Sequence, residues 1–188
     1  VFSTRYLKMF IDSIWYAALI TMITLIISYP AAYFISYSRF QNILLMLLII
    51  PTWINLLLKT YAFIGLLGHD GVINQALHIF QIPKLNLLFT SGAFLLVASY
   101  IYIPFKILPI FNSMKAIPNN ILQASNDLGA STFTTFRKVI VPLTREGIKT
   151  GVQVTFIPAL SLFMITRLIA GNKVINVGTA IEEQFLTI

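Results

Sequence analysis

Charged residues divide this chain into long apolar runs, and this division constrains its fold more than any other feature. Four stretches contain no Asp, Glu, Lys or Arg: residues 13–38, 40–58, 85–105 and 150–166. A helix that crosses the hydrocarbon core of a bilayer needs about 20 apolar residues, with a range of about 17–25. Because backbone groups at membrane depth must satisfy one another, each run is predicted to be helical.

The composition excludes several other classes of protein. Hydrophobic residues make up 57% of the 188 positions and charged residues 10%, against about 25% charged in soluble domains. There is no cysteine, so a disulfide framework or thiolate metal site is excluded. His69 and His78 lack a third ligand at metal spacing. The net charge of +7 fits the loops of a membrane protein better than a nucleic-acid partner.

We therefore predict an all-α, polytopic membrane helical bundle in which residues 1–188 form one transmembrane domain. The spans are expected near residues 10–38, 41–67, 86–112 and 145–168, with a loop at 113–144. Six Lys and Arg residues between positions 106 and 149 favour placing this loop in the cytoplasm. On the opposite side, residues 71–80 have the periodicity of a short helix at the membrane interface.

The loop pattern predicts two short helices that meet at a glycine. Asn119 and Asn120 can cap the first helix, and Gly129 suits the left-handed residue that ends it. Ser131 can cap a second helix over residues 132–140. Such an elbow suits a helix-in-groove contact with a soluble partner. A loop folded back on its own spans is the alternative.

The second half of the loop contains a predicted helix break, followed by a predicted start of the next helix. Pro142 disfavours helix at Val141 and predicts a break there. Thr144 can cap the last span, and Glu146 lies near the positive end of that helix.

This segment resembles the EAA loop of permease subunits in binding-protein-dependent ABC importers. That pattern reads Glu-Ala-Ala, three residues, Gly, nine residues, Ile, one residue, Leu-Pro. Ala124, Gly129 and Pro142 match it, and Val139 and Val141 fill the aliphatic positions. The resemblance implies contact with a separate ATPase subunit through Gln123, Ala124, Ser125, Asp127, Leu128, Gly129, Ala130 and Pro142.

Two positions depart from the pattern. Gln123 replaces the glutamate and Ser125 the second alanine. Where the family's glutamate would pair with a basic residue of the ATPase, Gln123 offers a neutral hydrogen bond. Charge-assisted hydrogen bonds are roughly twice as strong as neutral ones.

A wider resemblance covers most of the chain. Residues 51–62, 102–105 and 158–188 are similar to the B-type permease subunit of spermidine/putrescine importers. This implies a type I importer fold with four or five of six spans, in a multi-pass protein of the bacterial plasma membrane. It also implies an ATPase subunit, a second permease subunit and an extracytoplasmic substrate-binding protein as partners. The sequence has no phosphate-binding loop of its own, so we expect no enzymatic activity and no cofactor.

A polyamine is a flexible polycation, and its path should offer carboxylates, carbonyls and aromatic faces. The candidate path residues are Asp12, Trp53, Asn55, Tyr61, Ser161, Phe163 and Thr166. Arg167 would repel such a substrate unless it turns away. Two alternatives remain open: an importer of the same architecture for sulfate, molybdate, iron or a sugar, and a channel or carrier that needs no ATPase.

Overall fold

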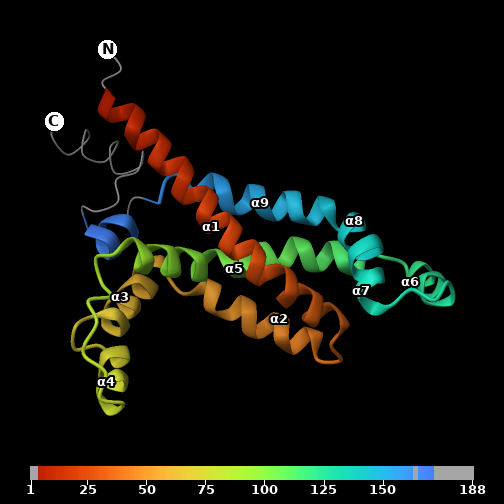
Figure 1. Cartoon of the computed structure of the whole chain (residues 1–188), viewed down its shortest axis with the longest axis horizontal. Helices are drawn as coiled ribbons and strands as arrows, with labels where there is room; N and C mark the ends of the chain where they lie inside the picture. The colour runs from red at the N-terminus through yellow and green to blue at the C-terminus, as the bar shows by residue number, and fades with distance from the viewer. Residues whose placement is uncertain (1–3, 163–164, 172–188) are drawn as a thin grey trace.

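The computed structural model describes residues 4–162 and 165–171, all of them in helices or short connections (Figure 1). The first part contains α1 (Thr4–Tyr37), α2 (Gln41–Ile49), the 3-10 turn η1 (Ile50–Trp53), α3 (Leu56–Leu67) and α4 (Val72–Ile79). The second contains α5 (Ser91–Lys115), α6 (Asn119–Asp127), α7 (Thr132–Thr135), the π-helix η2 (Phe136–Ile140), α8 (Val141–Leu143), α9 (Arg145–Ala159) and the π-helix η3 (Thr166–Ala170). Among the described residues there is no strand, in agreement with the predicted all-α class.

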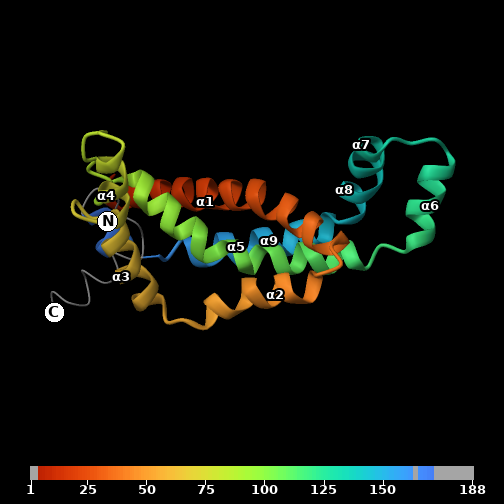
Figure 2. The ribbon, with the colours of Figure 1, turned by 90° about the horizontal axis from the view of Figure 1, so that it is seen from below.

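Three helices form the body of the molecule. α1, α5 and α9 run along its long axis and pack against one another (Figures 1 and 2). α3 and α4 lie at one end of this bundle, and α6, α7 and α8 lie at the other. Two apolar clusters fill the interior, one around Phe94, Val97 and Ile165 and the other around Ile107 and Ile110.

Small residues let α9 approach α5 closely. A Cβ added to Gly147 would lie 2.5 Å from Ser113 Cβ and 2.6 Å from Pro109 O. A Cβ on Gly151 would lie 3.0 Å from Lys106 Cγ. Packing through small residues is the usual way for helices to associate in a bilayer, where apolar burial gives little preference for protein over lipid.

Three segments among the described residues are long and apolar enough to cross a membrane by length and composition: Leu7–Tyr37, Leu56–Ile79 and Ser91–Lys115. The expected span at 41–67 is not one helix, which corrects the sequence expectation. α2 passes into η1 at Ile50, directly before Pro51, and the backbone is extended at Ile54 and Asn55. The Asn55 side chain then caps α3 by accepting a hydrogen bond from Leu57 N at 2.8 Å. Proline and asparagine together end one helix and start the next.

The ends of α5 and α9 differ from the predicted span boundaries for local reasons. α5 begins at Ser91 because the Thr90 hydroxyl accepts a hydrogen bond from Ala93 N at 3.1 Å, and it continues to Lys115. α9 ends at Ala159, directly after Pro158. Pro30 and Pro104, by contrast, lie inside α1 and α5 without ending them.

Candidate functional site

The loop between α5 and α9 forms a compact elbow, residues 117–144, beyond the end of the bundle. Figures 1 and 2 show α6 and α7 projecting away from α5 and α9, not folding back along them. Gly129 has a φ of +75°, so the predicted left-handed residue at the end of α6 is confirmed. Its amide donates to Asn126 O at 2.8 Å, and Ala130 N donates to Ser125 O at 3.1 Å. These two bonds close the end of the helix.

Short hydroxyl side chains hold the two arms of the elbow together. Ser125 Oγ and Thr135 Oγ1 are 2.8 Å apart, and both residues are buried. Ser131 Oγ accepts a hydrogen bond from Thr134 N at 3.3 Å, which confirms the predicted cap of α7. The serine that replaces the second alanine of the family pattern therefore has an internal role. It joins α6 to α7.

Two predicted helix signals in the part of the elbow before Thr144 are wrong. Pro118 occupies the N-cap of α6, so Asn119 and Asn120 lie in its first turn and do not cap it. Pro142 does not break the helix at Val141, because a π turn precedes it. Val141 N donates to Phe136 O, five residues back, and helical geometry continues to Leu143. This wider turn accommodates a residue that has no amide hydrogen.

The break comes instead at Thr144, which has φ −93° and ψ 9°. Thr144 stands at the N-cap of α9, but its hydroxyl makes no capping bond there. It donates to Ile140 O at 2.9 Å and lies 2.9 Å from the hydroxyl of Tyr29 on α1. The expected capping role is replaced by a link between helices.

Aromatic contacts attach the elbow to α1. The ring of Phe136 meets Tyr29 edge-on at 5.7 Å between centroids and meets Tyr33 at 5.3 Å. Edge-to-face pairs of this kind contribute roughly 0.5–1.5 kcal/mol beyond their buried area. Together with the Tyr29–Thr144 hydrogen bond, they connect the elbow to α1 as well as to its neighbours α5 and α9 in the chain.

The tip of the elbow exposes apolar side chains. Leu128 is 88% exposed and Phe133 69%. Of the other predicted coupling residues, Gln123, Ala124, Asp127 and Gly129 are exposed, Ala130 and Pro142 are half-buried, and Ser125 is buried. An exposed leucine and phenylalanine on rigid short helices form a surface suited to a groove in another protein.

The predicted path residues are dispersed. Asp12 is half-buried in α1, Trp53 is 85% exposed at the end of η1, Asn55 caps α3, and Tyr61 is 59% exposed on α3. Ser161 is exposed and donates to Pro158 O at 3.3 Å. No hydrogen bond, ion pair or ring contact within the described residues joins any of these five to another.

The last two candidates lie near the end of the described chain. Thr166 is buried in η3 and donates to Leu162 O at 2.6 Å, so its hydroxyl serves the backbone. Phe163 lies outside the described residues. Trp53, Asn55 and Tyr61 are therefore exposed members of the set that lie where α2 gives way to α3, whereas exposed Ser161 lies after α9.

Sequence reasoning misplaced one lysine. Lys106 was counted with the cations of the loop, but it lies in α5 and is fully buried. Its Nζ donates to Thr21 O and to Thr24 Oγ1, each at 2.7 Å, and so links α5 to α1. A buried ammonium group needs such partners. The sequence does indicate that Lys106 lies in the helix and not in the loop, because it directly follows an uncharged run of 21 residues.

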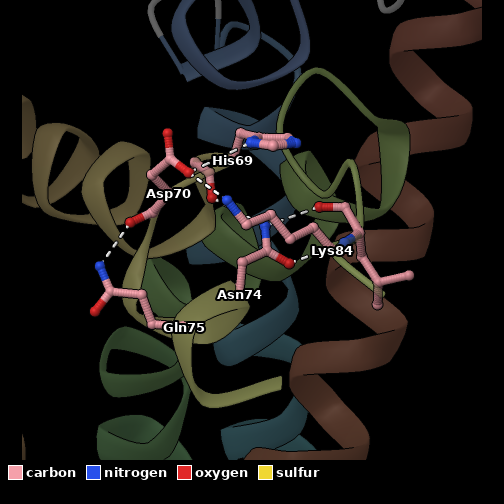
Figure 3. A network of polar contacts seen from close by, with 7 residues as sticks. His69, Asp70, Asn74, Gln75 and Lys84 are labelled. Carbon is pink, nitrogen blue, oxygen red and sulfur yellow. Dashed lines mark hydrogen bonds and ion pairs between the residues drawn. The ribbon is translucent and has the colours of Figure 1, made fainter. Parts of the chain in front are cut away.

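A polar network fixes the opposite end of the molecule (Figure 3). The side chain of buried Asn74 on α4 donates to Gly68 O at 3.1 Å and to Leu85 O at 2.9 Å, and accepts from Leu85 N at 2.9 Å. Asp70 pairs with Lys84 at 2.6 Å. The predicted short helix at 71–80 is present as α4.

Comparison with known proteins finds individual relatives of the chain but no matching family profile. No family model matches the chain. The spermidine/putrescine transport system permease protein PotB of Haemophilus influenzae is 34% identical over 191 residues, covering 99% of this chain and 66% of that protein. PotB of Escherichia coli is 33% identical over 188 residues, covering 97% of this chain and 68% of that protein. The chain thus spans about two thirds of the length of these relatives.

A solved structure matches the fold. A chain of the bacterial alginate ABC transporter, crystallised with an alginate pentasaccharide-bound periplasmic protein, has a TM-score of 0.84 to this chain. The match covers 99% of this chain and 69% of the other at 13% sequence identity. At this identity the similarity establishes the fold, that of an ABC transporter membrane subunit.

Proposed function

The chain belongs to the family of spermidine/putrescine transport system permease proteins, and from this premise we propose that it is a membrane permease subunit of an ATP-driven polyamine importer. It would form part of the translocation path in the bacterial plasma membrane. The observation that carries this proposal is the sequence identity of 33–34%, which extends over at least 97% of the chain.

The elbow supplies the mechanical part of the proposal. The chain would have no catalytic role, and ATP hydrolysis would take place in a partner ATPase. The exposed tip, with Leu128 and Phe133, would sit in a groove of that ATPase. When the ATPase subunits close on ATP, they would tilt the elbow. The contacts of Phe136 and Thr144 with Tyr29 would pass this movement to α1.

Two further partners complete the assembly. A second permease subunit would form the other wall of the path, and an extracytoplasmic binding protein would deliver the polyamine. Away from the elbow, the described part of the chain exposes few carboxylates. A path that selected polycations by itself would need several. This composition supports a division of labour in which the binding protein does most of the selection.

Uptake by the full-length protein with its partners tests the proposal. The assembly is reconstituted in proteoliposomes, and uptake of labelled spermidine is measured with ATP, without ATP, and with excess putrescine, sulfate or maltose. We expect ATP-dependent uptake that putrescine alone suppresses. Suppression by sulfate or maltose would favour an importer of another solute. Uptake without ATP would favour a channel or an ion-driven carrier.

A further inference from the structure

An open, apolar hollow lies where α2 gives way to α3. Leu47, Leu48 and Pro51 form one wall, and Tyr100 and Ile103 of α5 form the other. A second hollow, between α1, α3 and α5, shares Tyr100 and Ile103 with the first. The two hollows therefore adjoin along α5, and we call the pair the α5 furrow. The Phe63 ring lines the second hollow and stands against Tyr100 at 5.0 Å between centroids.

One cation lines this furrow among the described residues. Lys59 of α3 is half-buried at its edge, and its Nζ donates to Thr52 O at 3.3 Å. The ion pairs within the described chain involve Asp70 and Glu146, so Lys59 has no carboxylate partner there. An ionised side chain within a membrane segment is costly and generally has a counter-charge or a functional partner. One backbone carbonyl leaves two ammonium donors of Lys59 available.

The chemistry of the furrow selects its occupant. A polyamine would meet a like charge at Lys59 and apolar walls that offer no carboxylate. The complementary ligand has one negative group and a long hydrocarbon chain. The walls open onto the apolar surface of the molecule, since Leu47 is 63% exposed, Leu96 52% and Ile27 46%. In a membrane protein this surface is accessible to lipid.

We propose that the α5 furrow binds one anionic phospholipid, with its phosphate on the Lys59 ammonium and an acyl chain along Tyr100 and Ile103. The phosphate provides the counter-charge that the described chain lacks. The acyl chain fills the space that opens where Pro51 and Asn55 interrupt the helix. The lipid would stabilise the junction between α2 and α3 and leave the exposed candidates Trp53 and Tyr61 free.

Lipid titration of the purified full-length transporter tests this inference. The delipidated complex is titrated with phosphatidylglycerol, with phosphatidylcholine, and with glycerol phosphate, and bound molecules are counted by native mass spectrometry. The wild type should retain one more phosphatidylglycerol per subunit than the Lys59→Met variant, with about tenfold weaker binding in the variant, as expected for losing one charge-assisted hydrogen bond. Phosphatidylcholine binding should be equal in both proteins.

Three variants keep the test decisive. Lys115→Met removes an exposed lysine from the other end of α5 and should bind like the wild type. Lys59→Arg keeps the charge and should retain the lipid. Ile103→Trp fills the furrow while Lys59 stays, and should lose it. Equal phosphatidylglycerol binding by wild type and Lys59→Met would overturn the proposal. Displacement of the lipid by glycerol phosphate would also overturn it, because the tail would then contribute nothing. These readouts do not depend on which solute is transported.

Discussion

The two ends of the helix bundle are built in opposite ways. At the elbow, α6 and α7 are joined by a neutral hydrogen bond between the hydroxyls of Ser125 and Thr135 and by a single left-handed glycine. At the other end, α4 is held by the buried amide of Asn74 and by the ion pair of Asp70 with Lys84. The elbow exposes Leu128 almost completely, whereas the polar network of α4 is directed at its own chain (Figure 3).

This difference suits the elbow to transmitting a force to the bundle and suits the α4 network to holding its own end of the bundle together. The elbow is held by an internal hydrogen bond and attaches to three long helices, so under the proposed function a force on its tip would reach the bundle. The bonds of α4 connect it to nearby backbone, at Gly68 and Leu85, so a disturbance there stays local. Substitutions at the elbow should therefore change transport more than stability, and substitutions at α4 should do the reverse.

The largest effect is expected at Gly129. A β-branched residue at a φ of +75° is strained by more than the roughly 1–2 kcal/mol of an ordinary residue in this region. Gly129→Val should change the direction of the chain between α6 and α7 and lower ATP-driven uptake by about tenfold or more, since about 1.4 kcal/mol of strain placed on the docked geometry corresponds to a factor of ten. ATP hydrolysis by the assembly should become uncoupled from uptake.

Two controls sharpen this prediction. Gly129→Asn should keep partial transport because asparagine tolerates the left-handed region. Gly92→Ala places a methyl group at ordinary van der Waals distance, 3.9 Å from Thr90 Oγ1, and should transport normally. Uptake by Gly129→Val at the wild-type rate would contradict the lever mechanism.

At the opposite end, Asn74→Leu should cause the largest loss of stability. It leaves Leu85 N without its partner and removes one of the two hydrogen bonds that Gly68 O and Leu85 O each accept. The expected cost is about 2–4 kcal/mol of local stability. Hydrogen exchange should rise in residues 68–85 and stay unchanged in α5, with uptake lowered less than twofold. Exchange that also rises in the elbow would show that the two ends are coupled.

The sequence indicated those features that depend on neighbouring residues. Uncharged runs predicted helices, Gly129 predicted a left-handed end, and Ser131 predicted a cap. Features that depend on distant contacts were missed. Lys106 finds its acceptors on α1, 82 and 85 positions away. The break expected at Val141 is absent because a π turn accommodates Pro142, and no local pattern announces that turn.

The hydrogen bond between Ser125 and Thr135 should have a moderate effect on the elbow. Ser125→Ala, which restores the alanine of the family pattern, leaves the buried Thr135 hydroxyl without a partner and should cost about 1 kcal/mol. Adding Thr135→Val should recover most of this loss, because both polar groups are then removed. Thermal unfolding of the four proteins of this double-mutant cycle measures the coupling. Additive effects would mean that the 2.8 Å contact contributes no stability.

The smallest effect is expected from the ion pair at the α4 end. Asp70 is 83% exposed and Lys84 39%, and a pair so accessible to solvent is screened by water and salt. Asp70→Asn should leave the unfolding temperature within experimental error at 0.15 M salt, and lower it measurably only at low salt. Since the backbone carbonyl of Asp70 still accepts from Gln75, the turn should also keep its exchange protection. The contrary result is that Asp70→Asn destabilises residues 68–85 as much as Asn74→Leu does. That result would mean that the α4 end is held by its ion pair and not by the buried amide of Asn74, so that it would differ from the elbow through charge.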